Sequence, residues 1–194
     1  MLFVQLLTLQ SAALKLQLPT SVGRREAATL LSSAVLAAPL AASAALKPCP
    51  NGANNCYSSA STNKNKISTW SWPSGTSKTD AIKQLREVLE AYPKAGQNDA
   101  DGGGWDFTVD ELAASGYAKL EFKSAGTGNL ARFFNGGKPF IDDFEVSVED
   151  SSICLRSSSR AGDSDFNVNF KRVNYIAAGL REKGWAAPDV AKLS

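Results

Sequence analysis

The sequence predicts a single small α+β domain, in which an antiparallel sheet carries helices packed on one face, after a cleavable presequence. Three observations lead to this prediction. Apolar residues recur at three- and four-residue steps in two separate segments, which indicates two amphipathic helices. Apolar and polar residues alternate in the segments between them, which indicates strands with one buried face. A short polar turn joins the last two of these segments and favours antiparallel pairing.

A twin-arginine export signal is indicated near the N-terminus. Arg24 and Arg25 precede an apolar stretch at 27–40, which is too short to span a bilayer as a helix and leads into the small residues Ala-Ser-Ala. We expect cleavage of this signal between Ala44 and Ala45. An uncleaved membrane anchor is the alternative interpretation of the same stretch.

The expected cleavage site divides the chain into a presequence at 1–44 and a soluble mature domain at 45–194. A second targeting-like segment, 1–23, is rich in Leu, Gln, Ser and Thr and contains no acidic residue. Two targeting segments in series are typical of a plastid protein that is sent on to the thylakoid lumen. A bacterial periplasmic protein with a long leader is the alternative.

Cys49 and Cys56 lie in a turn-rich segment, 45–66, which we expect to form an irregular lead into the domain. The two cysteines are close enough in sequence to form a disulfide in an oxidising compartment, with two free thiols as the alternative. Without histidine they supply too few ligands for a zinc site. Cys154 stands in a run of alternating apolar residues, and we expect it to be a small core residue.

The first helix is expected shortly after an extended segment at 67–72. Ser77 or Thr79 can cap its N-terminus, and Pro93 ends it. Its apolar face consists of Ala81, Ile82, Leu85, Val88 and Leu89.

Four strands are expected after this helix, at 105–109, 117–122, 140–148 and 153–160. The turn at 149–152 pairs the last two as an antiparallel hairpin. In the third strand, Asp142 shares a face with the apolar residues. A loop at 126–137 carries Phe133 and Phe134.

The last helix is expected at 165–183, where Gly184 ends it. Its apolar face consists of Phe166, Phe170, Val173, Ile176, Ala177 and Leu180. Beyond this helix, the tail at 186–194 is free to extend along a neighbouring protein.

The composition argues against several classes of function. Basic and acidic residues balance over 45–194, so we expect no nucleic acid partner. The chain contains no histidine, which removes the usual general base and the commonest metal ligand. The loop at 97–104 is acidic and glycine-rich but lacks the spacing of a calcium-binding loop. We therefore expect no metal, no cofactor and no enzymatic activity.

Two stretches of the mature domain resemble the DUF1499 family of proteins of unknown function. The first combines Cys49-Pro50 with Asn-Cys-Tyr-Ser-Ser at 55–59. The second combines Ile-Asp-Asp-Phe-Glu-Val at 141–146 with the longer segment 155–172. Members of this family occur in bacteria, algae and plant plastids. The resemblance covers 49–180 and implies domain bounds and an exported address, but it supplies no mechanism.

The charged residues of the second stretch form the candidate site. They are Asp142, Asp143, Arg156, Arg160, Asp163, Asp165, Asn169 and Arg172. Arg156, Ser158 and Arg160 lie two apart on one strand, so their side chains share a face. Asp142 or Asp143 on the hairpin partner can lie opposite them.

Two interpretations of these residues stay open. In one, the paired guanidiniums and a nearby helix N-terminus bind a carboxylate, a phosphate or an anionic lipid head group. In the other, the arginines pair with Asp142, Asp143 and Asp163, while Asp165 or Ser164 caps the last helix. Near-balance of charge within the stretch favours this structural network.

The aromatic residues allow a third kind of site. Trp70, Trp72, Trp105, Trp185 and the pair Phe133-Phe134 form either core packing or exposed anchors for a partner protein. We expect a thylakoid-lumen accessory protein that docks peripherally on a photosynthetic membrane complex, such as a photosystem, as a subunit, stabiliser or assembly factor. The alternative is a module that binds a small anionic ligand or lipid in the lumen or periplasm.

Overall fold

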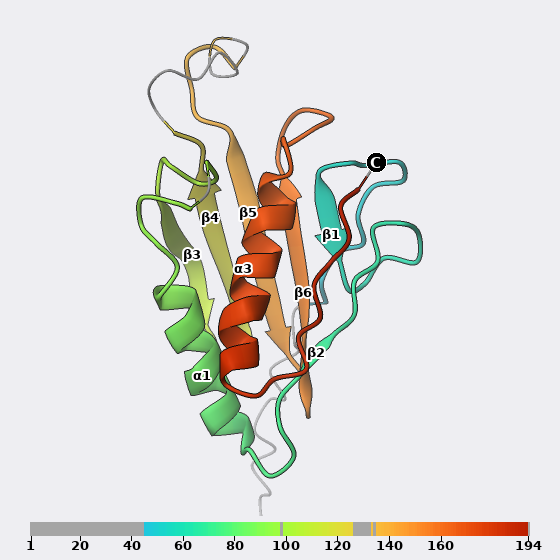
Figure 1. Ribbon diagram of the computed structural model, residues 1–194, viewed down its shortest axis with the longest axis vertical. Coiled ribbons are helices and arrows are strands. Elements are labelled where there is room, and N and C mark those ends of the chain that lie inside the picture. The colour runs from blue at the N-terminus through green and yellow to red at the C-terminus, as the bar shows by residue number, and fades with distance from the viewer. Residues whose placement is uncertain (1–44, 98, 126–132, 134, 194) are drawn as a thin grey trace, which may run out of the picture. The chain divides into compact units, whose positions relative to one another are not determined.

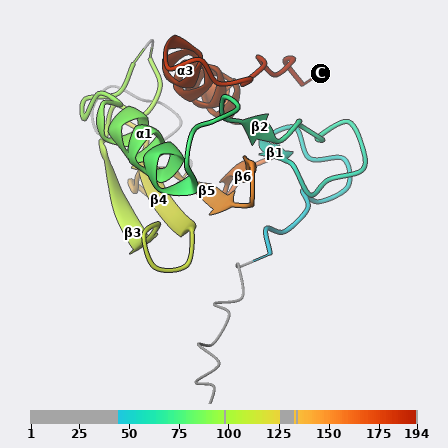
Figure 2. The same cartoon turned by 90° about the horizontal axis from the view of Figure 1, so that it is seen from below.

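In the described part of the chain, six antiparallel strands form one sheet, and two helices cover one of its faces (Figure 1, Figure 2). The computed structural model describes residues 45–97, 99–125, 133 and 135–193. The strands are β1 (Cys56–Ser58), β2 (Trp70–Ser71), β3 (Trp105–Glu111), β4 (Tyr117–Lys123), β5 (Ile141–Val148) and β6 (Ser152–Ser159). The helices are α1 (Lys78–Glu90) and α3 (Val168–Glu182). The predicted fold class is confirmed.

The strands run in the order β1-β6-β5-β4-β3, and β2 also pairs with β6. The predicted hairpin of β5 and β6 is present, with Asp143 opposite Ser158 and Val146 opposite Leu155. Strands that follow one another in the chain pair from β3 to β6, whereas β1, the first strand, pairs with the last strand, β6. The N-terminal lead and the last hairpin are therefore neighbours in space.

Of the two predicted candidates, Ser77 caps helix α1, and Thr79 lies inside the helix. The Ser77 hydroxyl accepts a hydrogen bond from the Asp80 backbone N–H at 3.1 Å. The buried residues of α1 belong to the predicted apolar face: Ala81, Leu85, Val88 and Leu89. Helix α3 approaches α1 closely at Gly179, where the lack of a side chain makes room. A Cβ atom there would lie only 2.9 Å from Val88 Cγ1.

The alternation predicted for β4 is confirmed. Its buried side chains are Ala118, Leu120 and Phe122, and its half-buried ones on the other face are Tyr117, Lys119 and Glu121. Leu120 lies between Phe107 of β3 and Phe144 of β5. The buried apolar residues from all strands and both helices form one core cluster between the sheet and the helices.

The last helix begins at Val168, three residues later than predicted. Phe166 and Asn167 have positive φ angles of 53° and 64°, and a right-handed helix cannot include such residues. The prediction that Phe166 belongs to the buried helix face is therefore wrong, because this side chain is 75% exposed. Asn167 occupies the N-cap position without a side-chain cap, and the carboxylate of Asp165 accepts the backbone N–H groups of Asn167 and Asn169 from outside the helix.

Cys154 is not a core residue, contrary to the prediction. It alternates with Ile153 and Leu155, which are fully buried, so its half-buried thiol lies on the opposite face of β6. The extended segment predicted at 67–72 contributes only two residues to the sheet, Trp70 and Ser71.

The C-terminal tail lies along its own domain. Ala186 pairs with Ser71 of β2, and Asn174 of α3 exchanges two hydrogen bonds with the backbone of Val190. Figure 1 shows the tail, drawn in dark red, running beside α3 towards β1. The interpretation of the tail as an arm for a neighbour is therefore wrong for the described residues up to Leu193. No helix among the described residues is long and apolar enough to cross a membrane.

Candidate functional site

The predicted site residues separate onto the two faces of the sheet. Asp142 and Asp143 are adjacent in β5 and therefore point to opposite faces. We call the face covered by the helices the inner face and the other the outer face. Asp142 joins the inner network, which consists of Asp101, Asp142, Ser157, Asn169 and Arg172. Asp143 joins the outer network, which consists of Tyr117, Lys119, Glu121, Asp143, Glu145, Arg156 and Arg160.

Arg172 of α3 is the centre of the inner network and has no exposed surface. Its Nη2 donates to Asp142 Oδ2 at 2.7 Å and to Asp101 Oδ1, and its Nε donates to Asp101 Oδ2 at 3.0 Å. Its Nη1 donates to Ser157 Oγ and Asn169 Oδ1 at 3.1 and 2.8 Å. These five contacts match the five N–H donors of a guanidinium.

The electrostatics of the inner network favour a charged arginine. Burial alone would lower the pKa of Arg172, but the carboxylates of Asp101 and Asp142 outweigh it and raise the pKa above its ordinary value. The guanidinium carbon also lies 4.3 Å from the centre of the Phe122 ring. The arginine is thus paired, stacked and excluded from water.

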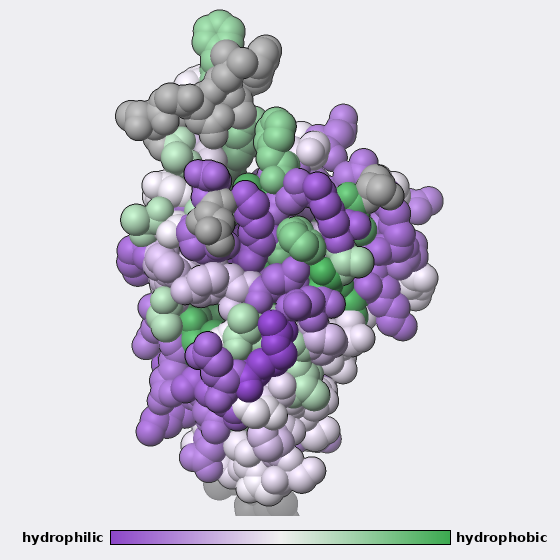
Figure 3. Space-filling view, in the orientation of Figure 1, coloured by the Kyte–Doolittle hydropathy of each residue, from purple (hydrophilic) through white to green (hydrophobic). Residues whose placement is uncertain are grey.

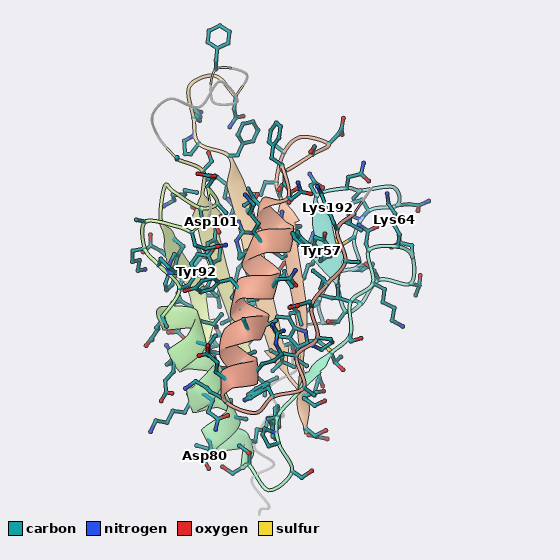
Figure 4. All side chains as sticks on the ribbon, viewed as in Figure 1. Tyr57, Lys64, Asp80, Tyr92, Asp101 and Lys192 are labelled. Carbon is teal, nitrogen blue, oxygen red and sulfur yellow. A yellow bond between two sulfur atoms is a disulfide. The ribbon has the colours of Figure 1, made fainter. Side chains whose placement is uncertain are left out.

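Asp101 lies in the glycine-rich loop before β3, and the sequence did not identify it as a site residue. It has a φ of 59° and is buried, and its carboxylate also accepts the Tyr92 hydroxyl at 2.6 Å. Burial, together with the negative charge of Asp101, raises the pKa of Tyr92. Figure 4 shows Tyr92 and Asp101 on the same side of α3. The acidic loop therefore serves as a partner of Arg172.

Asn169 links the inner network to the start of α3. Its Nδ2 donates to the Asp165 carboxylate at 2.7 Å and to Ser159 Oγ at 3.0 Å. The same amide nitrogen donates to the backbone C=O of Asn55 at 3.2 Å. The first turn of α3, the end of β6 and the lead into β1 thus meet at one buried amide.

Arg160 forms the more exposed half of the outer network. Its Nη2 lies 2.7 Å from Asp143 Oδ1 and 2.8 Å from Glu121 Oε2. Lys119 approaches Asp143 at 3.2 Å. Burial alone would raise the pKa of Asp143, but Arg160 and Lys119 lower it below its ordinary value. The Arg160 side chain is 44% exposed.

Arg156 has a separate partner, Glu145, which lies two residues after Asp143 in β5 and opposite Arg156. Its Nη1 donates to Glu145 Oε1 at 2.9 Å, and the Tyr117 hydroxyl donates to Glu145 Oε2 at 2.8 Å. Partial burial and Glu145 together raise the pKa of Tyr117. Asp163 lies exposed in the turn after β6 and is not among the carboxylate partners of Arg156 or Arg160 in the described structure.

The predicted disulfide is present between Cys49 and Cys56. Both residues are buried, and the Cys49 N–H donates to Ser61 Oγ at 2.8 Å. The disulfide joins the N-terminal lead to the edge strand β1. Of the predicted cleavage site, Ala45 is exposed, and Ala44 lies outside the described residues.

Two phenylalanines are the most exposed large apolar side chains described. Phe133 is 79% exposed in the connection between β4 and β5, and Phe166 is 75% exposed in the connection between β6 and α3. Three of the four tryptophans are buried instead: Trp70, Trp105 and Trp185. Phe134 lies outside the described residues.

No group of three or more histidine, cysteine, aspartate or glutamate side chains arranged to hold a metal ion occurs among the residues described. In the described residues, the fold and the site define a class: an α+β domain in which the buried Arg172 joins the covering helix to the sheet. The chain belongs to the DUF1499 family, described as proteins of unknown function, whose sequence profile matches residues 45–180. A comparison with curated proteins found no match.

Proposed function

We propose that the mature domain is a non-enzymatic accessory protein that docks on a photosynthetic membrane complex, a photosystem in the first instance, in the plastid thylakoid lumen. The proposed localisation rests on the twin-arginine signal and the segment before it. The docking role rests on one observation of the structure, the pair of exposed phenylalanines, Phe133 and Phe166.

The two phenylalanines lie at the same end of the sheet. Lys123 at the end of β4 is opposite Ile141 at the start of β5, and Asp142 is opposite Ser159 at the end of β6. The β4–β5 and β6–α3 connections therefore emerge side by side. Figure 1 shows both connections at the upper end of the sheet. We call this end, with Phe133 and Phe166, the aromatic end.

The turn that carries Phe166 is held in a defined conformation. Asp165 accepts the N–H groups of Asn167 and Asn169, and the Asn55 side chain donates to the Gly162 carbonyl at 2.6 Å. A phenylalanine with positive φ is rare, and such conformations persist only where the surroundings enforce them. An apolar anchor fixed before binding loses little conformational entropy when it docks, which strengthens binding.

Exposed aromatic residues are enriched in the centres of protein interfaces, where a few side chains supply most of the binding free energy. The aromatic end offers two such side chains next to polar turns. By contrast, an anionic ligand at Arg156 and Arg160 would have to displace Glu145 and Asp143, which already bind these guanidiniums. The geometry therefore favours docking over a ligand site on the outer face.

Co-purification tests this proposal. The full-length chain with a C-terminal tag is expressed in a plastid-containing alga, and solubilised thylakoid complexes are recovered on the tag. We expect the variant Phe133→Ser/Phe166→Ser to reduce recovery at least about tenfold, because interface anchors carry most of the affinity. The control is Tyr175→Ser, which removes a partly exposed aromatic residue from the middle of α3.

Thermal unfolding of the three proteins separates docking from stability. We expect the Phe133→Ser/Phe166→Ser variant to keep the wild-type Tm, because both rings are exposed. The proposal fails if the wild-type chain recovers no membrane complex, or if the double variant recovers as much as the wild type.

A further inference from the structure

A groove lies on the inner side of β1, between the loop that follows this strand and the C-terminal tail. Its volume is about 320 Å³, and it is lined by residues 57, 64 and 66–68 and by the tail at 188–193. This volume is at the lower end of the range for small-ligand sites. Figure 4 shows Tyr57, Lys64 and Lys192 together beside β1, across α3 from Tyr92 and Asp101.

The groove is positively charged. Lys64, Lys66 and Lys192 contribute three ammonium groups to its lining, and among the lining residues that the structure describes Asp189 contributes the one carboxylate. That carboxylate accepts a hydrogen bond from Arg181 Nη1 at 2.9 Å, so its charge is compensated from α3. The local field therefore favours an anion.

The interior of the groove is apolar and fixed. Ile67 is buried, and Val190 packs against the core from the tail. The Tyr57 hydroxyl donates to the Ala191 carbonyl at 3.1 Å and accepts the Leu193 N–H at 3.3 Å, so it holds the tail in place. Figure 3 shows apolar surface enclosed by hydrophilic side chains where the tail passes β1.

We propose that this groove binds a small amphipathic anion, with its carboxylate or phosphate group between the lysines and its apolar body against Ile67 and Val190. A free metabolite and the head group of an anionic lipid share this chemistry. The site uses none of the residues of the aromatic end, so its test is independent of the docking proposal.

Calorimetric titration of the full-length chain with hexyl phosphate tests the site. Hexanol provides the apolar body without the charge, and inorganic phosphate provides the charge without the body. We expect hexyl phosphate to bind at least about tenfold more tightly than either, because both parts of the groove contribute to its affinity. Equal affinity for hexyl phosphate and inorganic phosphate, or no binding of hexyl phosphate, would overturn the proposal.

A matched pair of variants locates the binding. The groove variant is Lys64→Gln/Lys66→Gln/Lys192→Gln, and the control is Lys78→Gln/Lys83→Gln/Lys138→Gln, which removes the same charge from exposed positions elsewhere. We expect the groove variant to lose at least about tenfold in affinity for hexyl phosphate, because charge-assisted hydrogen bonds are lost, and the control to keep it. Equal losses of affinity for hexyl phosphate in both variants would contradict a specific site in the groove.

Vesicles distinguish the two sources of the anion. Wild type and both variants are sedimented with vesicles of phosphatidylcholine, with and without phosphatidylglycerol. If wild type and the control variant are retained on the anionic vesicles and the groove variant is not, the anion is a lipid head group. Equal retention of all three proteins, together with groove-dependent binding of hexyl phosphate, assigns it to a free anion.

Discussion

The inner and outer networks use the same chemistry, an arginine between two carboxylates, but they differ in burial. Arg172 has no exposed surface, whereas the side chain of Arg160 is 44% exposed. Water screens an exposed ion pair and leaves it worth about 1 kcal/mol or less, but a buried charge without its partner costs several kcal/mol. The two faces of the sheet should therefore contribute very differently to stability.

The networks also differ in what they connect. Arg172 joins the helix α3 to the loop before β3 through Asp101 and to β5 through Asp142, over 71 and 30 positions of sequence. Arg160 joins neighbouring strands that the backbone ladder already pairs. The inner network thus fixes the position of α3 on the sheet. The outer network adds side-chain contacts between strands that the backbone hydrogen bonds already pair, so we expect the sheet to form without it.

The substitution Arg172→Met would break the comparison most strongly. It leaves Asp101 and Asp142 buried without their cation, and we expect a loss of about 3–5 kcal/mol in the free energy of unfolding. Urea denaturation measures it. If this variant does not fold, Arg172→Lys keeps the charge with fewer donors and should show an intermediate loss. A loss below about 1 kcal/mol for Arg172→Met would show that the inner network is not structural.

The disulfide offers a covalent comparison at the edge of the sheet. We expect Cys49→Ser/Cys56→Ser to lose about 2–3 kcal/mol, since the unfolded chain gains the entropy of an open eight-residue loop. Reduction of the wild type with dithiothreitol should reproduce this loss, whereas the variant itself should not respond to the reductant. A wild-type Tm that is unchanged under reducing conditions would contradict the prediction.

The substitution Arg160→Met probes the outer network at a matched residue type. We expect a loss of about 1 kcal/mol or less, because solvent screens this guanidinium and Lys119 still neutralises Asp143. Urea denaturation beside Arg172→Met gives the difference between the two faces directly. Losses of equal size in the two variants would remove the distinction drawn from burial.

The smallest effect concerns pH. The folded-state pKa of Asp143 is lowered, so its contribution to stability is fully present above its ordinary value of 3.8 and is lost as pH falls through the folded value. We expect Arg160→Met to weaken the dependence of Tm on pH in this acidic range and to leave it unchanged near neutrality. An altered dependence confined to neutral pH would contradict the assignment.

Periodicity predicted much of this arrangement. The alternation of β4 and the inward direction of Asp142 follow from spacing alone, whereas residue type left Ser77 and Thr79 as two candidate caps of α1. Arg172 could also have been placed inside, because it lies on the same helix face as Asn169 and Ile176, three and four residues away.

Other features depend on tertiary contacts that spacing does not encode. Asp101 reaches Arg172 only because its loop folds back over the sheet with a positive φ. Phe166 has the spacing of a helix-face residue, but the two left-handed residues at 166 and 167 delay the helix and turn its ring outward. Cys154, by contrast, could have been placed from spacing, because it alternates with the buried Ile153 and Leu155 and therefore lies on the outer face.

The inner network stabilises the domain, and we propose that the aromatic end binds the partner complex. Photo-cross-linking in intact thylakoids tests that claim most directly, with p-benzoylphenylalanine placed at Phe166 in one protein and at Ala113 in another. Ala113 is exposed in the β3–β4 turn at the opposite end of the sheet. We expect cross-links to a membrane-complex subunit from position 166 and none from position 113. Cross-links from position 113 with none from position 166 would contradict it.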